Sequence, residues 1–320
     1  MAWRFALVID PAAPDDEGAD YRDTLHEIDP HGPALGVGEL SAQRGDGVFE
    51  SLGVVDGHPQ EVGPHLARLA HSAALCDLPA PNLAQWRVAI ERVAREAGAG
   101  ENVMKLLLSR GVEHGPAPTA WITLADAPDN TSGRTTGVAV ATLDRGYALD
   151  VPARAPWLLL GAKTLSYAVN MAAIREAKRR GADDAVFVTS DGYLLEAPTA
   201  SVVLRVGDRF VTPEPQAGIL HGTTQLSLFA YLEGRGFTTA YETVPAKDLA
   251  TADAAWLLSS VRLAAPIRSV DGIEVPVDRA FTDELNAYLL SPATERPGND
   301  EGPAGAGPSH GTAYPKRPET

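Results

Sequence analysis

The chain has 320 residues, enough for one large domain or two smaller ones, and its 44% apolar and 22% charged residues are typical of a soluble globular protein. Its net charge of −15 argues against a nucleic-acid or anionic-membrane partner, because both bind positive protein surfaces. The one cysteine, Cys76, excludes an internal disulfide, and the lack of a membrane-length apolar run or a signal-like N-terminus predicts a cytoplasmic protein.

The first half of the chain predicts a sheet with two helices. The stretch GVFESLGVVDGHPQEV contains two β-rich runs around Asp56 and Gly57, which is a hairpin signal. Segments 64–78 and 83–98 carry apolar residues at helical spacing. Three apolar runs follow without helices between them, so we expect antiparallel strands over 102–111, 118–125 and 136–144.

The second half predicts a further set of strands and helices. A helix is expected from Ser166 to Arg180, because its last turn is basic and Gly181 follows it. A second helix is expected where GTTQ opens an apolar stretch over 222–236. Apolar and β-branched runs predict strands over 184–190, 200–206, 209–213 and 254–261.

These elements predict an α+β protein of two domains, with mostly antiparallel sheets flanked by helices. The stretch RGYALDVPARAPW is rich in Pro and Arg and is typical of a linker. The last thirty residues have almost no large apolar side chains and are expected to be disordered. The predicted limits are a small N-terminal domain 1–145, a linker 146–160, a larger domain 161–290 and a tail 291–320.

Two charged residues stand in apolar surroundings. In AKTLSY, loss of solvation would lower the pKa of the Lys163 amine and make it nucleophilic, as a Schiff-base lysine requires. In DGYLLEAPTASVV, Glu196 lies between a turn and a β-branched strand, where a carboxylate could keep a pyridine nitrogen protonated. Taken alone, Lys163 also fits a snorkelling lysine at a helix start, and Glu196 fits a solvated acid at a strand end.

A third group of residues suits a phosphate. Thr223 and Thr224 open a helix, so they offer hydroxyls, backbone N–H groups and the positive end of the helix dipole. Ser259 and Ser260 end a buried strand, and Arg68 lies on an earlier helix. Each also has an ordinary structural interpretation, as a helix cap or an exposed arginine.

The order of these residues resembles that of the class IV aminotransferases, the fold-type IV pyridoxal-phosphate enzymes. Arg68 comes first, Lys163 is followed 33 residues later by Glu196, and the threonine and serine pairs come after them. The similar stretches include RGDGVFE, HLARLAHSAALCDL, AKTLSY, YLLEAPTASVVL, TPEPQAGILHGTTQ and LLSSVRLAAPI, and they run from Arg44 to about residue 275.

The resemblance implies a role for each residue. Lys163 would be the Schiff-base lysine and general base, and Glu196 the partner of the pyridine nitrogen of pyridoxal phosphate. Tyr167 is implied near the phenolic oxygen of the cofactor. Arg110, in LLSRG, matches an arginine used for a substrate carboxylate, a task that suits a bidentate guanidinium. The phosphate ligands would be Arg68, Thr223, Thr224 and Ser260, and no metal site is implied.

Three positions depart from the family pattern. Ser201 stands where Asn is usual, so one polar contact near the cofactor would be rebuilt. Gln225 stands where Arg is usual. Phe49 stands where many family members have Tyr, and this change is expected to affect substrate recognition more than cofactor binding.

Three activities occur in such proteins: 4-amino-4-deoxychorismate lyase, D-amino-acid aminotransferase and branched-chain aminotransferase. RGDGVFESLGVVDGHP and AKTLSY are most similar to the lyases, and the aromatic stretch usual in branched-chain enzymes is missing. We therefore expect a lyase of folate synthesis that gives 4-aminobenzoate and pyruvate. An aminotransferase stays open, as does a non-catalytic pyridoxal-phosphate-binding protein. The expected partners are a small-molecule substrate and a second copy in a homodimer.

Overall fold

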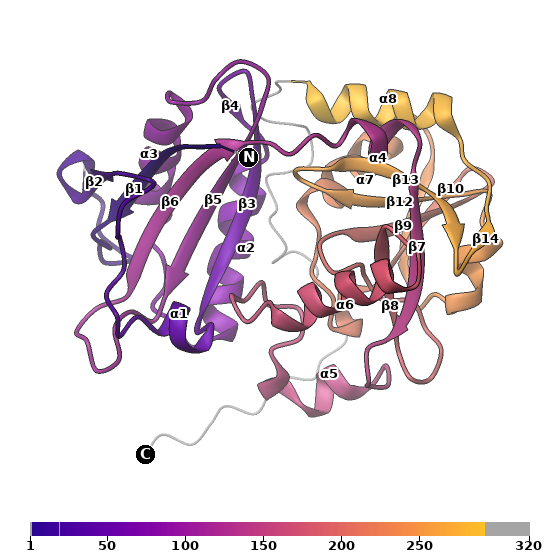
Figure 1. The fold of residues 1–320 in the computed structure, drawn as a ribbon, viewed down its shortest axis with the longest axis horizontal. Coiled ribbons are helices and arrows are strands. Elements are labelled where there is room, and N and C mark those ends of the chain that lie inside the picture. Colours follow the sequence, from indigo (N-terminus) through magenta and orange to yellow (C-terminus); the bar gives the residue numbers. More distant parts are fainter. Residues whose placement is uncertain (1, 19, 292–320) are drawn as a thin grey trace.

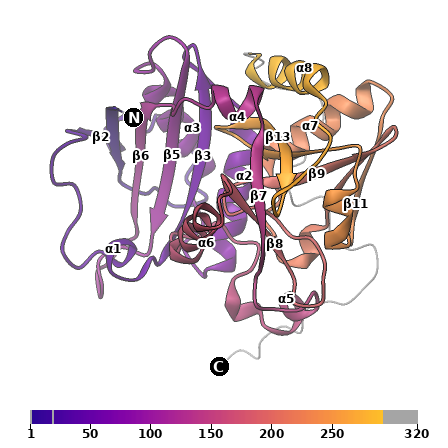
Figure 2. The ribbon, with the colours of Figure 1, turned by 45° about the vertical axis from the view of Figure 1, so that its right-hand side comes forward.

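A computed structural model describes residues 2–18 and 20–291, which form two β-sheets lying side by side, each with its own helices (Figures 1 and 2). Apart from Ser291, the predicted tail lies outside the described residues. Within the described ranges, no helix has both the length and the apolar character needed to cross a bilayer.

The first sheet is antiparallel throughout, with the strand order β2–β1–β6–β5–β3–β4. The hairpin predicted around Asp56 and Gly57 is confirmed, because β3 and β4 pair on either side of these two positive-φ residues. The strands are β1 (Trp3–Ile9), β2 (Leu25–Ile28), β3 (Gly47–Val55), β4 (His58–Pro59), β5 (Glu101–Ser109) and β6 (Thr119–Asp126).

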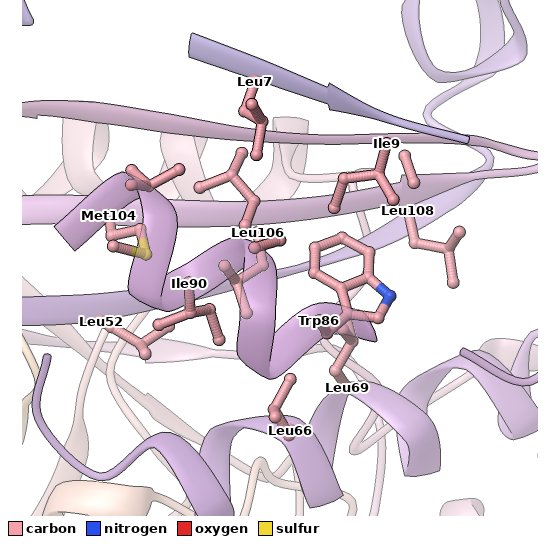
Figure 3. Close-up of a cluster of buried hydrophobic side chains, with 14 of the residues drawn as sticks. Leu7, Ile9, Leu52, Leu66, Leu69, Trp86, Ile90, Met104, Leu106 and Leu108 are labelled. Carbon is pink, nitrogen blue, oxygen red and sulfur yellow. The ribbon is translucent and has the colours of Figure 1, made fainter. Parts of the chain in front are cut away.

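Two helices cover one face of this sheet. Helix α2 (Val62–Leu75) packs on β3, and α3 (Leu83–Ala94) packs on β1 and β6. Leu52 of β3 and Leu106 of β5 lie in one cluster with Ile90 and Trp86 of α3, and all four side chains are buried (Figure 3). The apolar face of the strands, which repeats every two residues, therefore packs against the apolar faces of α2 and α3 in one core.

The second sheet has eight strands and mixes parallel with antiparallel pairs. Its order is β11–β10–β9–β12–β13–β7–β8, with β14 paired to β13; the pairs β10–β11, β13–β7 and β7–β8 are parallel. The strands are β7 (Val138–Asp144), β8 (Asp184–Val188), β9 (Ser201–Val206), β10 (Arg209–Pro213), β11 (Thr238–Glu242), β12 (Ala254–Ser259), β13 (Leu263–Val270) and β14 (Ile273–Glu274).

Strand β7 corrects one expectation. The sequence grouped it with β5 and β6 as a third antiparallel strand, but it pairs in parallel with β8 and β13 of the second sheet. The expectation rested on the rule that strands adjacent in sequence often pair, which favours β6. The actual partners of β7 both come later in the chain. The chain thus passes from one sheet to the other between Asp126 and Val138, ahead of the predicted linker 146–160.

Helices also cover the second sheet. Side chains of α7 (Thr223–Gly234) and α8 (Arg279–Leu290) form one core with β12 and β13, and α6 (Ala168–Arg179) packs on β7 and β8. The helices predicted over 166–180 and 222–236 are confirmed as α6 and α7. The remaining described helices are α1 (Leu40–Arg44), α4 (Thr131–Thr135) and α5 (Val151–Arg154), with 3₁₀ turns at Arg22–Thr24, Pro156–Leu158, Pro215–Ala217 and Ala246–Ala250.

The residues just before α6 join the two units by pairing with β3. The N–H of Phe49 donates to the carbonyl of Lys163 at 3.0 Å, and the N–H of Leu165 donates to the carbonyl of Gly47 at 2.8 Å. Further along β3, a Cβ on Gly53 would lie 2.7 Å from the carbonyl oxygen of Ser260, so a glycine is needed there. The seam between the units is therefore tight at backbone level.

Candidate active site

A cavity of about 480 Å³ lies at this seam and takes its lining from both units. Seven of the eight site residues predicted from the sequence line it, and Arg110 does not. The seven are Arg68, Lys163, Tyr167, Glu196, Thr223, Thr224 and Ser260.

Lys163 enters the cavity from the segment that pairs with β3. Its Nζ lies 4.7 Å from the centroid of the Phe49 ring, which is a cation–π distance. Burial lowers the pKa of the Lys163 amine from 10.5 to about 8, and the nearby Arg68 guanidinium acts in the same direction. At a given pH near neutrality, a larger fraction of Lys163 is therefore neutral than of an exposed lysine. Only the neutral amine can act as a nucleophile or base.

Glu196 enters from the loop between β8 and β9. Burial raises the pKa of its carboxyl from 4.5 to about 7, although the Leu220 N–H and the positive charge of Lys163 oppose this shift. That N–H donates to Oε2 of Glu196 at 3.2 Å. A cation brought against the carboxyl would restore its charge, so the position suits a protonated ring nitrogen.

Tyr167 packs edge-on against Phe49, with 5.4 Å between the ring centroids. Its hydroxyl donates to the carbonyl of Pro198 at 2.6 Å, and Asn170 Nδ2 donates to the same carbonyl at 2.7 Å. Burial raises the pKa of Tyr167 to about 12, so the hydroxyl keeps its proton and can serve as a donor. Asn170 also lines the cavity and was not predicted from the sequence.

Three hydroxyls gather at the N-terminus of α7. Ser260 Oγ lies 3.1 Å from Thr224 Oγ1 and 3.3 Å from Thr223 Oγ1. The residue capping the helix is Gly222, so no side chain from that position occupies the first N–H groups. The hydroxyls and the positive helix end together form a cradle for an anion. We call Thr223, Thr224 and Ser260 the hydroxyl cradle.

The structure shows where two departures from the family pattern, Ser201 and Gln225, lie. A Cβ on Gly222 would lie 2.2 Å from Ser201 Oγ, so Ser201 fills the space under the glycine that opens the cradle. Gln225 is buried and is not among the lining residues, and its Nε2 donates to the Tyr241 hydroxyl at 2.9 Å. Neither departure interrupts the cradle.

Arg68 is held by a buried carboxylate that the sequence did not single out. Its Nε and Nη2 each donate to Glu50 at 2.7 Å, and Nη1 donates to the carbonyl of His221 at 2.8 Å. His65 Nδ1 lies 2.7 Å from the same carboxylate. Burial alone would raise the pKa of Glu50, but Arg68 and His65 outweigh it and hold that pKa well below its usual range. The alternation of β3, which puts Glu50 on the core face, is the signal that could have found it.

Lys105 of β5 is a further lining residue that was not predicted. It lies opposite Ser51 of β3 in the register of the sheet. Within residues 2–18 and 20–291, its side chain makes no hydrogen bond or ion pair, while its charge contributes to the lowered pKa of Lys163. The cavity thus contains an uncompensated cation that can receive an anionic ligand. The signal in the sequence is its place between the inward-facing Met104 and Leu106.

Arg110 lies outside the lining of the cavity. Its Nε and Nη2 donate to the two carboxylate oxygens of Asp46 at 2.7 and 3.2 Å. Its remaining contacts are with the carbonyls of Cys76 and Asp77, at 2.8 and 3.1 Å. Within one chain the structure therefore does not bring Arg110 together with the other site residues.

The sequence matches known proteins over most of its length. A family model described as amino-transferase class IV matches residues 47–270. A protein of Mycobacterium tuberculosis named bifunctional aminodeoxychorismate lyase / D-amino acid transaminase is 42% identical over 278 residues, which are 82% of this chain and 96% of the relative.

Solved structures agree with the fold. The fold IV-transaminase CpuTA1 from Curtobacterium pusillum has a TM-score of 0.85 and 47% identity, covering 90% of this chain and 99% of its own. The PLP-bound form of a hypothetical aminotransferase from Mycobacterium tuberculosis has a TM-score of 0.81 and 39% identity, covering 90% and 98%. The predicted α+β class is confirmed, with one antiparallel and one mixed sheet flanked by helices.

The residues lining the cavity fit pyridoxal phosphate, the cofactor bound in the second of these structures. The hydroxyl cradle and Arg68 can receive a phosphate, Lys163 offers an amine of lowered pKa, and Glu196 offers a buried carboxyl of raised pKa. Among the described residues, no group of His, Cys, Asp and Glu side chains could hold a metal ion. The donor set is thus that of an organic phosphate site.

The lowered pKa of Lys163 can be measured directly. In cofactor-free protein, reaction of Lys163 with trinitrobenzenesulfonate should be half-maximal near pH 8, because only the neutral amine attacks and burial lowers its pKa to about 8. Peptide mass spectrometry would follow the modification, with the exposed Lys178 of α6 as the reference. A Lys163 profile that still rises steeply at about pH 10 would contradict the effect of burial.

Proposed function

The chain belongs to the class IV aminotransferase family, and from this we propose that it is a pyridoxal-phosphate enzyme acting as a 4-amino-4-deoxychorismate lyase. As a second activity we propose transamination of D-amino acids. One observation supports both: the relative that carries both names is 42% identical to this chain over 96% of its own length. That the protein is a class IV enzyme with pyridoxal phosphate follows from the family match itself.

Each site residue then receives a proposed task. Thr223, Thr224, Ser260 and Arg68 would hold the phosphate of the cofactor, Lys163 would hold its aldehyde, and Glu196 would hold its ring nitrogen. Tyr167, whose hydroxyl donates to the carbonyl of Pro198, would lie near the phenolic oxygen of the cofactor. When bound, the cofactor supplies an electron sink for charge that develops next to the substrate amine.

The proton transfer is assigned to Lys163. Its amine, with a pKa of about 8, would remove the proton from the ring carbon beside the substrate nitrogen. In the lyase reaction the bond to the enolpyruvyl oxygen then breaks, pyruvate leaves and the ring becomes aromatic. In transamination the same amine would return the proton to a different carbon, and a keto acid would be needed for the second half-reaction.

Lys105 is proposed to bind a substrate carboxylate. Both lyase products are carboxylates, so the substrate carries two negative charges that need partners away from its amine. Lys105 faces the cavity without a counter-ion in the described part of the chain. Arg262, which also lines the cavity, is paired with Asp184 through Nη1 at 2.8 Å, while its Nε and Nη2 have no hydrogen-bond partner in the described part of the chain. Because the charge of Arg262 has an ion-pair partner there and that of Lys105 has none, Lys105 is the better-supported partner for a substrate carboxylate.

We also propose that the enzyme is a homodimer. Several large apolar side chains around the seam are exposed, and Trp157 is 74% exposed. Trp157 and Val169 line a hollow of about 550 Å³ that shares Tyr167 and Glu196 with the cavity. A second copy covering this surface would remove the apolar area from water.

The retained Lys163 argues against a protein that only carries the cofactor. A binding protein could use the Lys163 amine to hold the aldehyde but needs no general base, whereas an amine with a pKa of about 8 can serve in both tasks. Incubation with substrate therefore distinguishes the two classes.

The first prediction concerns the reaction. With aminodeoxychorismate alone, the enzyme should release 4-aminobenzoate and pyruvate in equal amounts, because elimination needs no keto acid. Both products can be measured by chromatography, and Lys163→Ala should lose the activity by more than the roughly 10²–10⁴-fold typical of a lost acid–base group. Glutamate formation from a D-amino acid and 2-oxoglutarate with no 4-aminobenzoate would leave transamination as the only function.

A second prediction separates Lys105 from Arg110. Lys105→Met should raise KM for the substrate by about 10–100-fold, the scale of a hydrogen bond to a charged group, and leave the cofactor spectrum unchanged. Arg110→Met is the matched control, since Arg110 is paired with Asp46 outside the lining. If Arg110→Met raised KM and Lys105→Met did not, the role predicted from the sequence would return to Arg110.

The dimer can be tested by light scattering. Trp157→Glu should shift the protein toward the monomer mass, because a charge would have to be buried at the contact. Val206→Glu, at an apolar residue that is 57% exposed on β9, is the control and should leave the mass unchanged. A wild-type monomer at micromolar concentration would refute the proposal.

A further inference from the structure

Behind the hydroxyl cradle lies one imidazole, that of His65. Its Nε2 is 3.1 Å from Ser260 Oγ and 3.2 Å from Thr223 Oγ1. Its Nδ1 is 2.7 Å from Glu50, and the side chains of His65 and Glu50 are both fully buried. A single ring thus connects the ion pair of Arg68 to the cradle.

The protonation of Nδ1 follows from its contact with Glu50. Glu50 accepts two hydrogen bonds from Arg68, whose guanidinium keeps the carboxylate ionised. An ionised carboxylate only accepts hydrogen bonds, so Nδ1 of His65 must carry a hydrogen. The state of the ring is therefore decided at Nε2 alone.

The protonation of Nε2 decides where the hydroxyls of the cradle can donate their hydrogens. Each hydroxyl of the cradle has one hydrogen to donate, and a phosphate dianion only accepts. If His65 is neutral, one hydroxyl must donate to Nε2 and is lost to the phosphate. If Nε2 carries a hydrogen, it donates to the hydroxyl oxygens, and Thr223 and Ser260 can both point their hydrogens at the phosphate.

We propose that Glu50 and His65 are positioning residues of the hydroxyl cradle, and that Nε2 of His65 takes up a proton when the cofactor phosphate binds. This inference rests on the proposed assignment of the phosphate to the cradle. The proton comes from solvent, one N–H bond forms at Nε2, and no other bond changes.

The charges around the ring support this coupling. In the cofactor-free chain, burial lowers the pKa of His65, the guanidinium of Arg68 and the amine of Lys163 oppose protonation, and Glu50 favours it. A phosphate dianion next to the hydroxyls adds negative charge, so it shifts the balance toward the protonated ring.

Two further acidic residues lie near the ring and must be counted. Glu61, at the start of α2, and Glu101, at the start of β5, line a small hollow together with His65. Glu101 is paired with Arg134, and neither carboxylate is among the groups that shift His65. Hydroxyls of Thr223 and Ser260 cover the remaining side of Nε2. The phosphate is therefore the group whose arrival changes the charge at this ring.

The sign of the pH dependence follows from linkage. Because the loaded state binds one more proton than the empty state, affinity for the phosphate group should fall as pH rises from the pKa of the free ring to that of the loaded ring. The slope contributed by His65 approaches tenfold per pH unit in that window.

The probe for this inference is pyridoxamine 5′-phosphate, because it lacks the aldehyde and does not react with Lys163. Titration calorimetry in buffers of different ionisation enthalpy should show an additional proton, up to one, taken up by the wild type relative to His65→Gln. The glutamine keeps an N–H donor near the position of Nε2 without a titrating group. Affinity in His65→Gln should fall less steeply with pH, and titration of the phosphate itself is common to both proteins.

Nitrogen NMR of histidine-labelled wild-type protein gives a readout that needs no variant. Addition of pyridoxamine phosphate should move one histidine signal from the neutral to the doubly protonated pattern. Equal proton uptake by wild type and His65→Gln, or no such change in the spectrum, would overturn the inference. Thr224→Ala tests the underlying assignment separately, because unchanged affinity in that variant would mean that the phosphate does not lie in the cradle.

Discussion

The buried contact between Glu50 and Arg68 is the interaction on which the site depends. Glu50 belongs to the first sheet and Arg68 to the helix that covers it, yet Arg68 also reaches the carbonyl of His221 in the second unit. One guanidinium therefore fixes the cradle relative to β3. Removing one member of such a buried pair typically costs about 3–5 kcal/mol, because the other charge is left without a partner. The geometry of the hydroxyl cradle is therefore held by electrostatics as well as by packing.

Burial shifts the two chemical groups of the cavity in opposite directions. It lowers the pKa of Lys163 to about 8 and raises that of Glu196 to about 7, so both groups move toward their neutral forms. A ligand with a negative phosphate at one end and a protonated ring nitrogen at the other supplies the charges that this cavity lacks. The same desolvation would favour the binding of a zwitterionic cofactor in this cavity, and it leaves more of the Lys163 amine in the neutral form that a base requires.

Neither unit could form the site alone. Arg68 and Lys105 come from the first unit, whereas Lys163, Glu196 and the hydroxyl cradle come from the second. The pairing of β3 with the segment that carries Lys163, and the close approach at Gly53, bring these groups within one cavity. In the proposed assignment, Lys105 of the first sheet would bind a substrate carboxylate, and the cofactor would be held by Arg68 together with loops and a helix end of the second unit.

Most of the helices and strands could be predicted from the sequence, because they depend on local periodicity. The order of Arg68, Lys163, Glu196 and the hydroxyl residues pointed to the family, which the matches confirm. The partner of β7 could not be read, because parallel pairing joins segments far apart in sequence and an apolar run fits either sheet equally well.

By itself the sequence determined which residues are apolar, where the turns fall and which chemical groups are available. Only the tertiary structure decided which of these groups meet. Glu50 and His65 look like ordinary polar residues until packing removes them from water and places them against Arg68 and Ser260. Arg110 matches a family pattern, but folding places it beside Asp46, whereas Lys105 lines the cavity. The physical reason is that charge and hydrogen-bonding capacity belong to a residue, whereas desolvation and proximity exist only once the chain is folded.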